Sequence, residues 1–294
     1  MKQSYYEANA RKRLAGLLDP GSFRELLPPQ ERVVSPYLPL LDLPVAFDDG
    51  VIVGQGALDG RNVLVASQEG GFLGGAIGEV HGAKLTGLFE RAADEKPAAT
   101  LLLVESGGVR LHEANAGLIA VSETMRALLG AREAGVTVIA LIGSTYGCFG
   151  AMGLLARCCD VVIMSEEGRL GMSGPEVIEN SHGVEEFDSR DRALVWRTMG
   201  GKHRYLLGDA QQLVDDNVDA FRAAAIAALG ERRPLTLEAL SAEHEFFEQR
   251  LARFGHCADA LDIWRALGIA DPEAVPLLDT AEFLAIARNV RQGH

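Results

Sequence analysis

The sequence predicts an α/β domain built around a largely parallel β-sheet. Apolar runs of strand length alternate with helical patterns, two of these runs end in glycine-rich turns, and a hairpin signal comes before them. The chain has 294 residues, 48% of them hydrophobic, which is enough for one large domain or one domain with an appendage.

The N-terminal part, residues 1–49, is expected to hold a short helix followed by an extended connector. Residues 7–18 show helical spacing, with Arg11, Lys12 and Arg13 on the polar side, and the helix should end at Asp19-Pro20-Gly21. Prolines recur from there to residue 49, which favours extended chain.

A hairpin is expected to open the main domain, residues 50–233. Asp59-Gly60 separates two apolar-rich runs at 51–58 and 61–67, which is a strong signal for a two-residue turn. The glycines of this region do not form a dinucleotide-binding fingerprint, because Gly60 comes one position late and a hairpin takes the place of the helix.

Two strand-turn-helix units follow the hairpin and a helix within residues 76–95. The strands are expected at 100–104, 136–142 and 160–164, and the helices at 115–134 and 150–158. Pro175 suits the first turn of a further helix, with Glu176 beside it. Later helices are expected at 189–200, 209–229, 236–253 and 279–291, with residues 234–294 forming a helical appendage.

Composition limits the classes of function. A formal charge of −13 argues against a nucleic-acid surface. No apolar run reaches the roughly 18 residues of a membrane span, and the N-terminus has no signal-peptide core. The spacing of the four cysteines fits neither a zinc ribbon nor a disulfide framework, so we expect reduced thiols and a cytoplasmic protein.

Two glycine turns form the main functional lead. Gly107-Gly108 follows the strand at 100–104, and the glycine-rich segment 143–153 follows the next strand along the chain. Glycine lets backbone N–H groups point at a ligand, and preorganised N–H donors stabilise negative charge that develops on an oxygen. The pair of turns predicts a site for an enolate or a tetrahedral oxyanion.

Side chains near these turns are weaker candidates. Ser106 and Cys148 lack a nucleophile elbow, and we expect both to be small residues in tight backbone space. His81, His112 and Glu113 are candidates for proton transfer, with a structural role as the alternative for each. No metal is expected, because nothing adds further ligands to His81.

Four motifs, in order along the chain, resemble the carboxyltransferase branch of the crotonase superfamily, which includes acetyl-CoA and propionyl-CoA carboxylase β subunits. The motifs are Arg11-x-Arg13 with residues 18–25, Ser106-Gly107-Gly108-Val109-Arg110, Gly150-Ala151, and Gly174-Pro175-Glu176-Val177-Ile178. Val109 stands where the family usually has Ala. The resemblance covers residues 7–185 and implies a crotonase-like spiral of ββα units with a helical C-terminal region.

Within that branch the chain most resembles β subunits of biotin-independent malonate decarboxylases, through residues 4–11, 78–84 and 143–160. It has a single crotonase unit and no four-cysteine zinc ribbon. This resemblance implies a homologous, γ-type partner subunit, an acyl carrier protein and an acyl transferase subunit. The chain itself is expected to bind no cofactor, because the prosthetic group, derived from dephospho-CoA, belongs to the carrier.

The implied reaction converts a malonyl thioester on the carrier into an acetyl thioester and CO₂ through an enolate. The resemblance places the N–H groups of Gly107, Gly108 and Val109 on one side of the enolate oxygen and those of Gly150 and Ala151 on the other. His81 and Glu113 are tentative proton-transfer residues. Two alternatives stay open: a carboxyltransferase subunit of a biotin-dependent acyl-CoA carboxylase, and a non-catalytic scaffold.

Overall fold

A single seven-stranded sheet organises the structure, a computed structural model that describes residues 3–45 and 49–291. Residues 1–2, 46–48 and 292–294, which fall within the first and last predicted segments, lie outside the described residues. The strands lie in the sheet in chain order: β1 (Arg24–Leu26), β2 (Val51–Leu58), β3 (Arg61–Gln68), β4 (Ala99–Val104), β5 (Val138–Ile142), β6 (Val161–Ser165) and β7 (Gln212–Val214).

The first three strands are antiparallel and the others are parallel. β2 and β3 form the predicted hairpin, with Leu58 opposite Arg61 across the Asp59-Gly60 turn. From β3 to β7 each strand pairs in parallel with the next. The prediction of a largely parallel sheet is confirmed. β1 was not predicted, because this three-residue strand lies inside the proline-rich connector.

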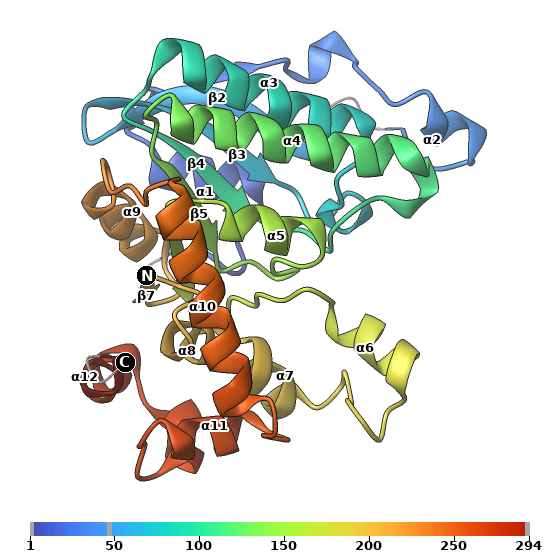
Figure 1. Cartoon of the computed structure of the whole chain (residues 1–294). Helices are drawn as coiled ribbons and strands as arrows, with labels where there is room; N and C mark the ends of the chain where they lie inside the picture. Colours follow the sequence, from blue (N-terminus) through green and yellow to red (C-terminus); the bar gives the residue numbers. More distant parts are fainter. Residues whose placement is uncertain (1–2, 46–48, 292–294) are drawn as a thin grey trace.

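Helices cover both faces of the sheet. One face packs against α3 (Glu79–Glu95), α4 (Asn115–Glu133) and α5 (Ala151–Arg157), and the other against α1 (Ala10–Leu17) and α9 (Val218–Ala227) (Figure 1). Alternate residues of β4 divide between the two cores: Leu102 and Val104 join the first, and Leu101 and Leu103 the second. Burial on both faces explains the continuous apolar runs in the sequence.

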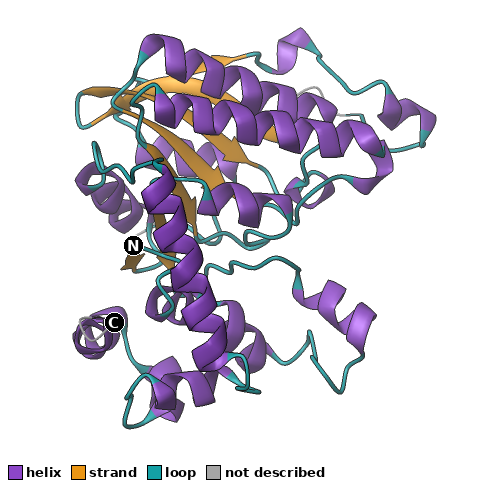
Figure 2. Ribbon diagram, in the orientation of Figure 1, coloured by secondary structure: helices purple, strands orange, loops and turns teal. Residues whose placement is uncertain are grey.

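The rest of the chain is mainly helical (Figure 2). Its elements are α6 (Pro175–His182), α7 (Arg192–Met199), α8 (Gly201–Leu206), α10 (Leu237–Phe254), α11 (Ala260–Ala266) and α12 (Thr280–Arg291). The short helix α2 (Tyr37–Leu40) lies in the connector. Pro175 occupies the first turn of α6, as predicted. The domain boundary near residues 231–234 stays a prediction.

Two predictions are wrong. The helix expected at 209–229 begins only at Val218, because Gln212–Val214 forms β7 at the edge of the sheet, where it pairs with β6. Arg13, expected on the polar side of the first helix, is 1% exposed and points into the protein. Its guanidinium has a buried carboxylate partner, which helical periodicity cannot reveal.

All four cysteines are free thiols, with Cys148 and Cys159 buried and Cys158 and Cys257 partly buried. None of the helices in the described part of the chain is both long enough and apolar enough to cross a membrane.

Candidate active site

The two glycine turns meet beyond the carboxyl ends of β4 and β5. The Ser106 N–H donates to the Gly147 carbonyl over 2.9 Å, and the Phe149 N–H donates to the Ser106 carbonyl over 2.9 Å. These bonds extend the parallel pairing of the strands into the turns. The structure therefore brings together the segments that the sequence singled out.

A third turn, after β6, completes the arrangement and was not predicted. The Cys148 N–H donates to the Arg169 carbonyl over 2.8 Å, and the Gly150 N–H donates to the Met172 carbonyl over 3.1 Å. A signal was present in the sequence, since Gly168 and Gly171 follow the strand as glycines follow the two earlier strands. Three successive turns thus lie side by side at the carboxyl ends of β4, β5 and β6.

Close backbone approach explains two of the glycines. Gly108 has φ +125° and Gly150 has φ +56°. A Cβ added to Gly150 would lie 3.1 Å from the Gly108 Cα, and one added to Gly108 would lie 3.6 Å from the Ala151 nitrogen. Both the left-handed backbone and the limited space disfavour a side chain here.

The structure narrows the set of possible N–H donors. The Gly107 N–H donates to the Gly74 carbonyl (2.9 Å), the Gly108 N–H to the Ser106 Oγ (3.1 Å), and the Gly150 N–H to Met172. Within the described residues, the N–H groups of Val109 and Ala151 have no acceptor. Both residues are partly exposed, which makes their N–H groups the candidates for donation to a bound molecule.

A buried ion cluster supports the first turn. Arg110 Nη1 lies 2.8 Å from Asp49 Oδ1 and 2.7 Å from Glu113 Oε1, and the other Glu113 oxygen accepts the Glu79 N–H over 2.6 Å. The Arg110 N–H also donates to the Ile77 carbonyl over 2.8 Å. Burial raises the pKa of Asp49, although Arg110 opposes this shift.

A second buried network holds the residue before the turn. Glu105 Oε2 lies 2.6 Å from Arg13 Nη1, and the Glu105 N–H donates to Gln68 Oε1 over 3.1 Å. The Gln68 Nε2 lies 3.1 Å from the His81 Nε2. Buried side chains therefore anchor the turn on both sides, with Glu105 before it and Arg110 after it.

The proposed acid-base residues belong to these networks. His81 is fully buried, and its backbone N–H donates to Asp49 Oδ2 over 2.7 Å. Burial lowers the pKa of His81 well below its usual range, and the positive charges of Arg110 and Lys84 lower it further. Both oxygens of the buried Glu113 accept hydrogen bonds from within the chain. This geometry favours structural roles for both, while His112 is exposed.

Ser106 and Cys148 occupy tight backbone space. Both are fully buried, the Ser106 Oγ accepts the Gly108 N–H, and burial raises the pKa of the Cys148 thiol well above its usual range. A neutral buried thiol is a poor nucleophile. The described residues contain no group of three or more His, Cys, Asp or Glu side chains that could hold a metal.

Exposed apolar side chains lie on the turns and on the helices that follow them. Their exposed fractions include 78% for Leu111 and 63% for Met172, and the others in this set are Leu118, Ile119 and Leu154. These residues come from α4, α5 and the segments next to the turns. The segments next to the turns thus present apolar side chains to solvent.

Comparison with known proteins places this geometry in context. The carboxyl transferase domain family matches residues 7–221. The chain is 41% identical to the malonyl-S-ACP:biotin-protein carboxyltransferase MADC of Malonomonas rubra, covering 98% of this chain and 97% of the relative.

Solved structures show the same likeness. A chain of the Pseudomonas malonate decarboxylase hetero-tetramer, solved in complex with malonate, matches with a TM-score of 0.82 and 39% identity over 90% of this chain and 97% of that one. The transcarboxylase 12S structure with methylmalonyl-coenzyme A matches with a TM-score of 0.65 and 27% identity, over 76% of this chain and 41% of that one.

The sheet, its turns and these likenesses define an α/β enzyme subunit of the crotonase fold. The chain belongs to the carboxyl transferase domain family. The resemblance to malonate decarboxylase subunits, expected from the sequence motifs, is confirmed.

Proposed function

We propose that this chain decarboxylates a malonyl thioester, carried by an acyl carrier protein, as the β-type subunit of a malonate decarboxylase. The observation that carries the proposal is the pair of acceptor-free N–H groups, those of Val109 and Ala151, on turns in backbone contact. Likeness to proteins that act on malonate or malonyl groups supports the substrate class.

The reaction needs little more than an oxyanion site. The bond between the methylene carbon and the carboxylate breaks, and CO₂ leaves as a neutral molecule. The electron pair of the broken bond stays with the thioester and forms its enolate. The Val109 and Ala151 N–H groups would stabilise the enolate oxygen, and loss of one such donor costs about 10²- to 10³-fold in rate. A proton then adds to the carbon and gives the acetyl thioester.

Neither His81 nor Glu113 is suited to donate this proton. His81 is buried as a neutral ring, and both oxygens of Glu113 are occupied by Arg110 and Glu79. A second subunit that packs against the turns would instead supply the acid.

A hetero-oligomer follows from the same proposal. The exposed apolar residues beside the turns would pack against a homologous, γ-type crotonase subunit. The Pseudomonas structure is itself a hetero-tetramer. An acyl transferase subunit would load malonate onto the carrier, whose dephospho-CoA-derived group presents the thioester to this chain, and the complex would work in the cytoplasm.

Carboxyl transfer to biotin is the second candidate, because the Malonomonas rubra relative is a biotin-protein carboxyltransferase. Both reactions would use the same enolate and the same N–H groups, but transfer passes the carboxyl group to biotin. The purified complex, given a malonyl carrier, distinguishes them. We expect acetyl carrier and CO₂ to form without a biotinylated protein and in the presence of avidin. Turnover that requires a biotinylated acceptor would select carboxyl transfer.

A further inference from the structure

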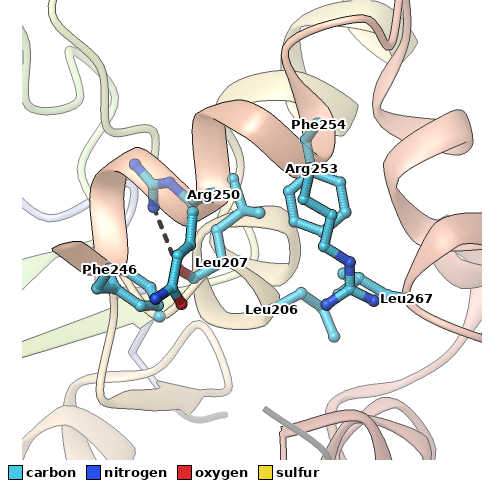
Figure 3. Close-up of a pocket in the computed structure, with 9 residues that line it drawn as sticks. Leu206, Leu207, Phe246, Arg250, Arg253, Phe254 and Leu267 are labelled. Atoms are coloured by element: carbon cyan, nitrogen blue, oxygen red, sulfur yellow. Dashed lines mark hydrogen bonds between the residues drawn. The ribbon is translucent and has the colours of Figure 1, made fainter.

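Helix α10 lies across the protein without burying any of its residues (Figure 1). Hollows remain beneath it, one of about 360 Å³ between α10 and the residues Leu206, Leu207 and Leu267. Figure 3 shows Arg250 and Arg253 leaving the helix in different directions, with Arg250 donating to the Leu207 carbonyl. Arg250 also reaches a second, smaller pocket.

This smaller pocket, of about 150 Å³, lies beside the third glycine turn. Arg157, Arg204, Arg250 and Asp209 line it together with Gly171 and Met172 of that turn. We call it the arginine pocket. It borders the candidate active site, because the Met172 carbonyl accepts the Gly150 N–H.

Three guanidinium groups in the arginine pocket share one buried carboxylate. Asp209 lies 2.9 Å from Arg250, 3.1 Å from Arg204 and 3.5 Å from Arg157. Arg157 also contacts the partly exposed Glu243, at 2.7 Å, but Glu243 lies 3.7 Å from a fourth arginine, Arg233.

Positive charge therefore exceeds negative charge in the arginine pocket. Three arginines and one carboxylate line the arginine pocket, in a protein whose formal charge is −13. Burial lowers the pKa of Arg204, and the charges of Arg250 and Arg157 lower it further, although Asp209 opposes them. Such an excess of half-buried positive charge is costly without an anion nearby.

We propose that the arginine pocket binds a phosphate-type anion. Guanidinium groups match phosphate oxygens with two parallel hydrogen bonds, and the pocket has the size of a small anionic group. The phosphate would belong to the prosthetic arm of the carrier, and this assignment rests on the proposed function. Bound in the pocket, the phosphate would anchor the arm while the thioester at the end of the arm reaches Val109 and Ala151.

Direct binding tests the pocket without any turnover. Isothermal titration calorimetry of the full chain with inorganic phosphate and pyrophosphate, at low salt, should show saturable binding. Arg250→Gln should weaken it at least about tenfold, because a charge-assisted contact is lost. Asp209→Asn, if its melting temperature shows that it folds, should tighten binding by removing the competing carboxylate.

Arg253→Gln is the matched control. Arg253 lies on the same helix and donates to the Ala266 carbonyl over 2.9 Å, but it does not line the arginine pocket. It should change affinity less than about twofold, which is the size expected for a screened, distant charge. Absence of saturable binding to the wild-type chain, or equal effects of the two substitutions, would overturn the proposal.

Turnover by the assembled complex identifies the source of the phosphate. If the pocket holds the arm, inorganic phosphate should raise the KM for the malonyl carrier without lowering kcat, and Arg250→Gln should raise KM while blunting the effect of phosphate. If phosphate binds but leaves KM unchanged, the anion site stands with free phosphate as its ligand, and the arm is excluded. A complex that binds phosphate but does not decarboxylate would refute the proposed function alone.

Discussion

Arg110 Nη1 lies 2.8 Å from Asp49 Oδ1, and both side chains are almost completely buried. The same guanidinium nitrogen contacts Glu113 at 2.7 Å, so one positive charge, on the residue that follows Val109, faces two carboxylates. Arg110 is therefore a positioning residue of the first turn. It touches no reacting atom in this account, but it fixes the backbone that carries a donor.

Replacement of Arg110 tests this support. Arg110→Met should lower the free energy of unfolding by about 3–5 kcal/mol, because it leaves two buried carboxylates without a positive charge beside them. Arg126→Met is the control: Arg126 forms exposed ion pairs with Glu90 and Glu123, so its replacement should lower the free energy of unfolding far less than Arg110→Met does. Urea denaturation measures both. Similar small losses for the two variants would contradict the assigned role.

The left-handed turn at Gly150 predicts a contrast between two glycines. Gly150→Ala should destabilise the protein by about 1–3 kcal/mol, because φ is +56° and the Gly108 backbone is close. Gly87→Ala, in an exposed position of α3 with open space around it, should stabilise the protein by about 0.5–1 kcal/mol. Chemical denaturation should show that the free energy of unfolding falls for Gly150→Ala and rises for Gly87→Ala. Changes of the same sign would refute the close approach of the Gly108 and Gly150 backbones.

Buried neutral histidines predict acid sensitivity. Burial lowers the pKa of His203 to about 3, so this ring stays neutral in the folded protein at pH values where the unfolded chain binds a proton. The unfolded state then binds more protons below about pH 6.5, and stability falls as pH decreases.

The expected loss for one such group is about 1.4 kcal/mol per pH unit between about pH 6 and 4. His203→Asn removes this contribution and keeps an acceptor for the Trp264 Nε1, which lies 3.1 Å from the His203 Nδ1. Denaturation at several pH values should give a shallower slope for the variant than for the wild type. Parallel slopes would show that His203 is not buried as a neutral ring.

Local patterns in the sequence predicted most of the fold, and the misses have physical reasons. The hairpin at Asp59-Gly60 and the buried runs at β4, β5 and β6 depend on local turn chemistry and periodicity. β7 and the burial of Arg13 depend on contacts between distant segments: β7 pairs with β6, and Arg13 meets Glu105.

The site was predicted in outline only. Glycines after two neighbouring strands indicated the turns, and the structure places these in backbone contact. Gly74, Ser106 and Met172 supply the acceptors for the other N–H groups of the turns, and their contacts leave Val109 and Ala151 as the donors without an acceptor. No local pattern in the sequence shows those contacts. The arginine pocket was missed for the same reason, because Arg157, Arg204 and Arg250 are far apart in the sequence.

Substitution of Ala151 tests the oxyanion site most directly. Ala151 is the first residue of α5, a position where proline is well tolerated, so Ala151→Pro removes one N–H at little cost to the fold. Ala151→Ser changes the side chain and keeps the N–H, which makes it the matched control. The measurement is kcat for CO₂ release from a malonyl carrier by the assembled complex. We predict a loss of about 10²- to 10³-fold for Ala151→Pro with the complex still formed, and a small change for Ala151→Ser. Unchanged turnover in the intact Ala151→Pro complex would contradict the account.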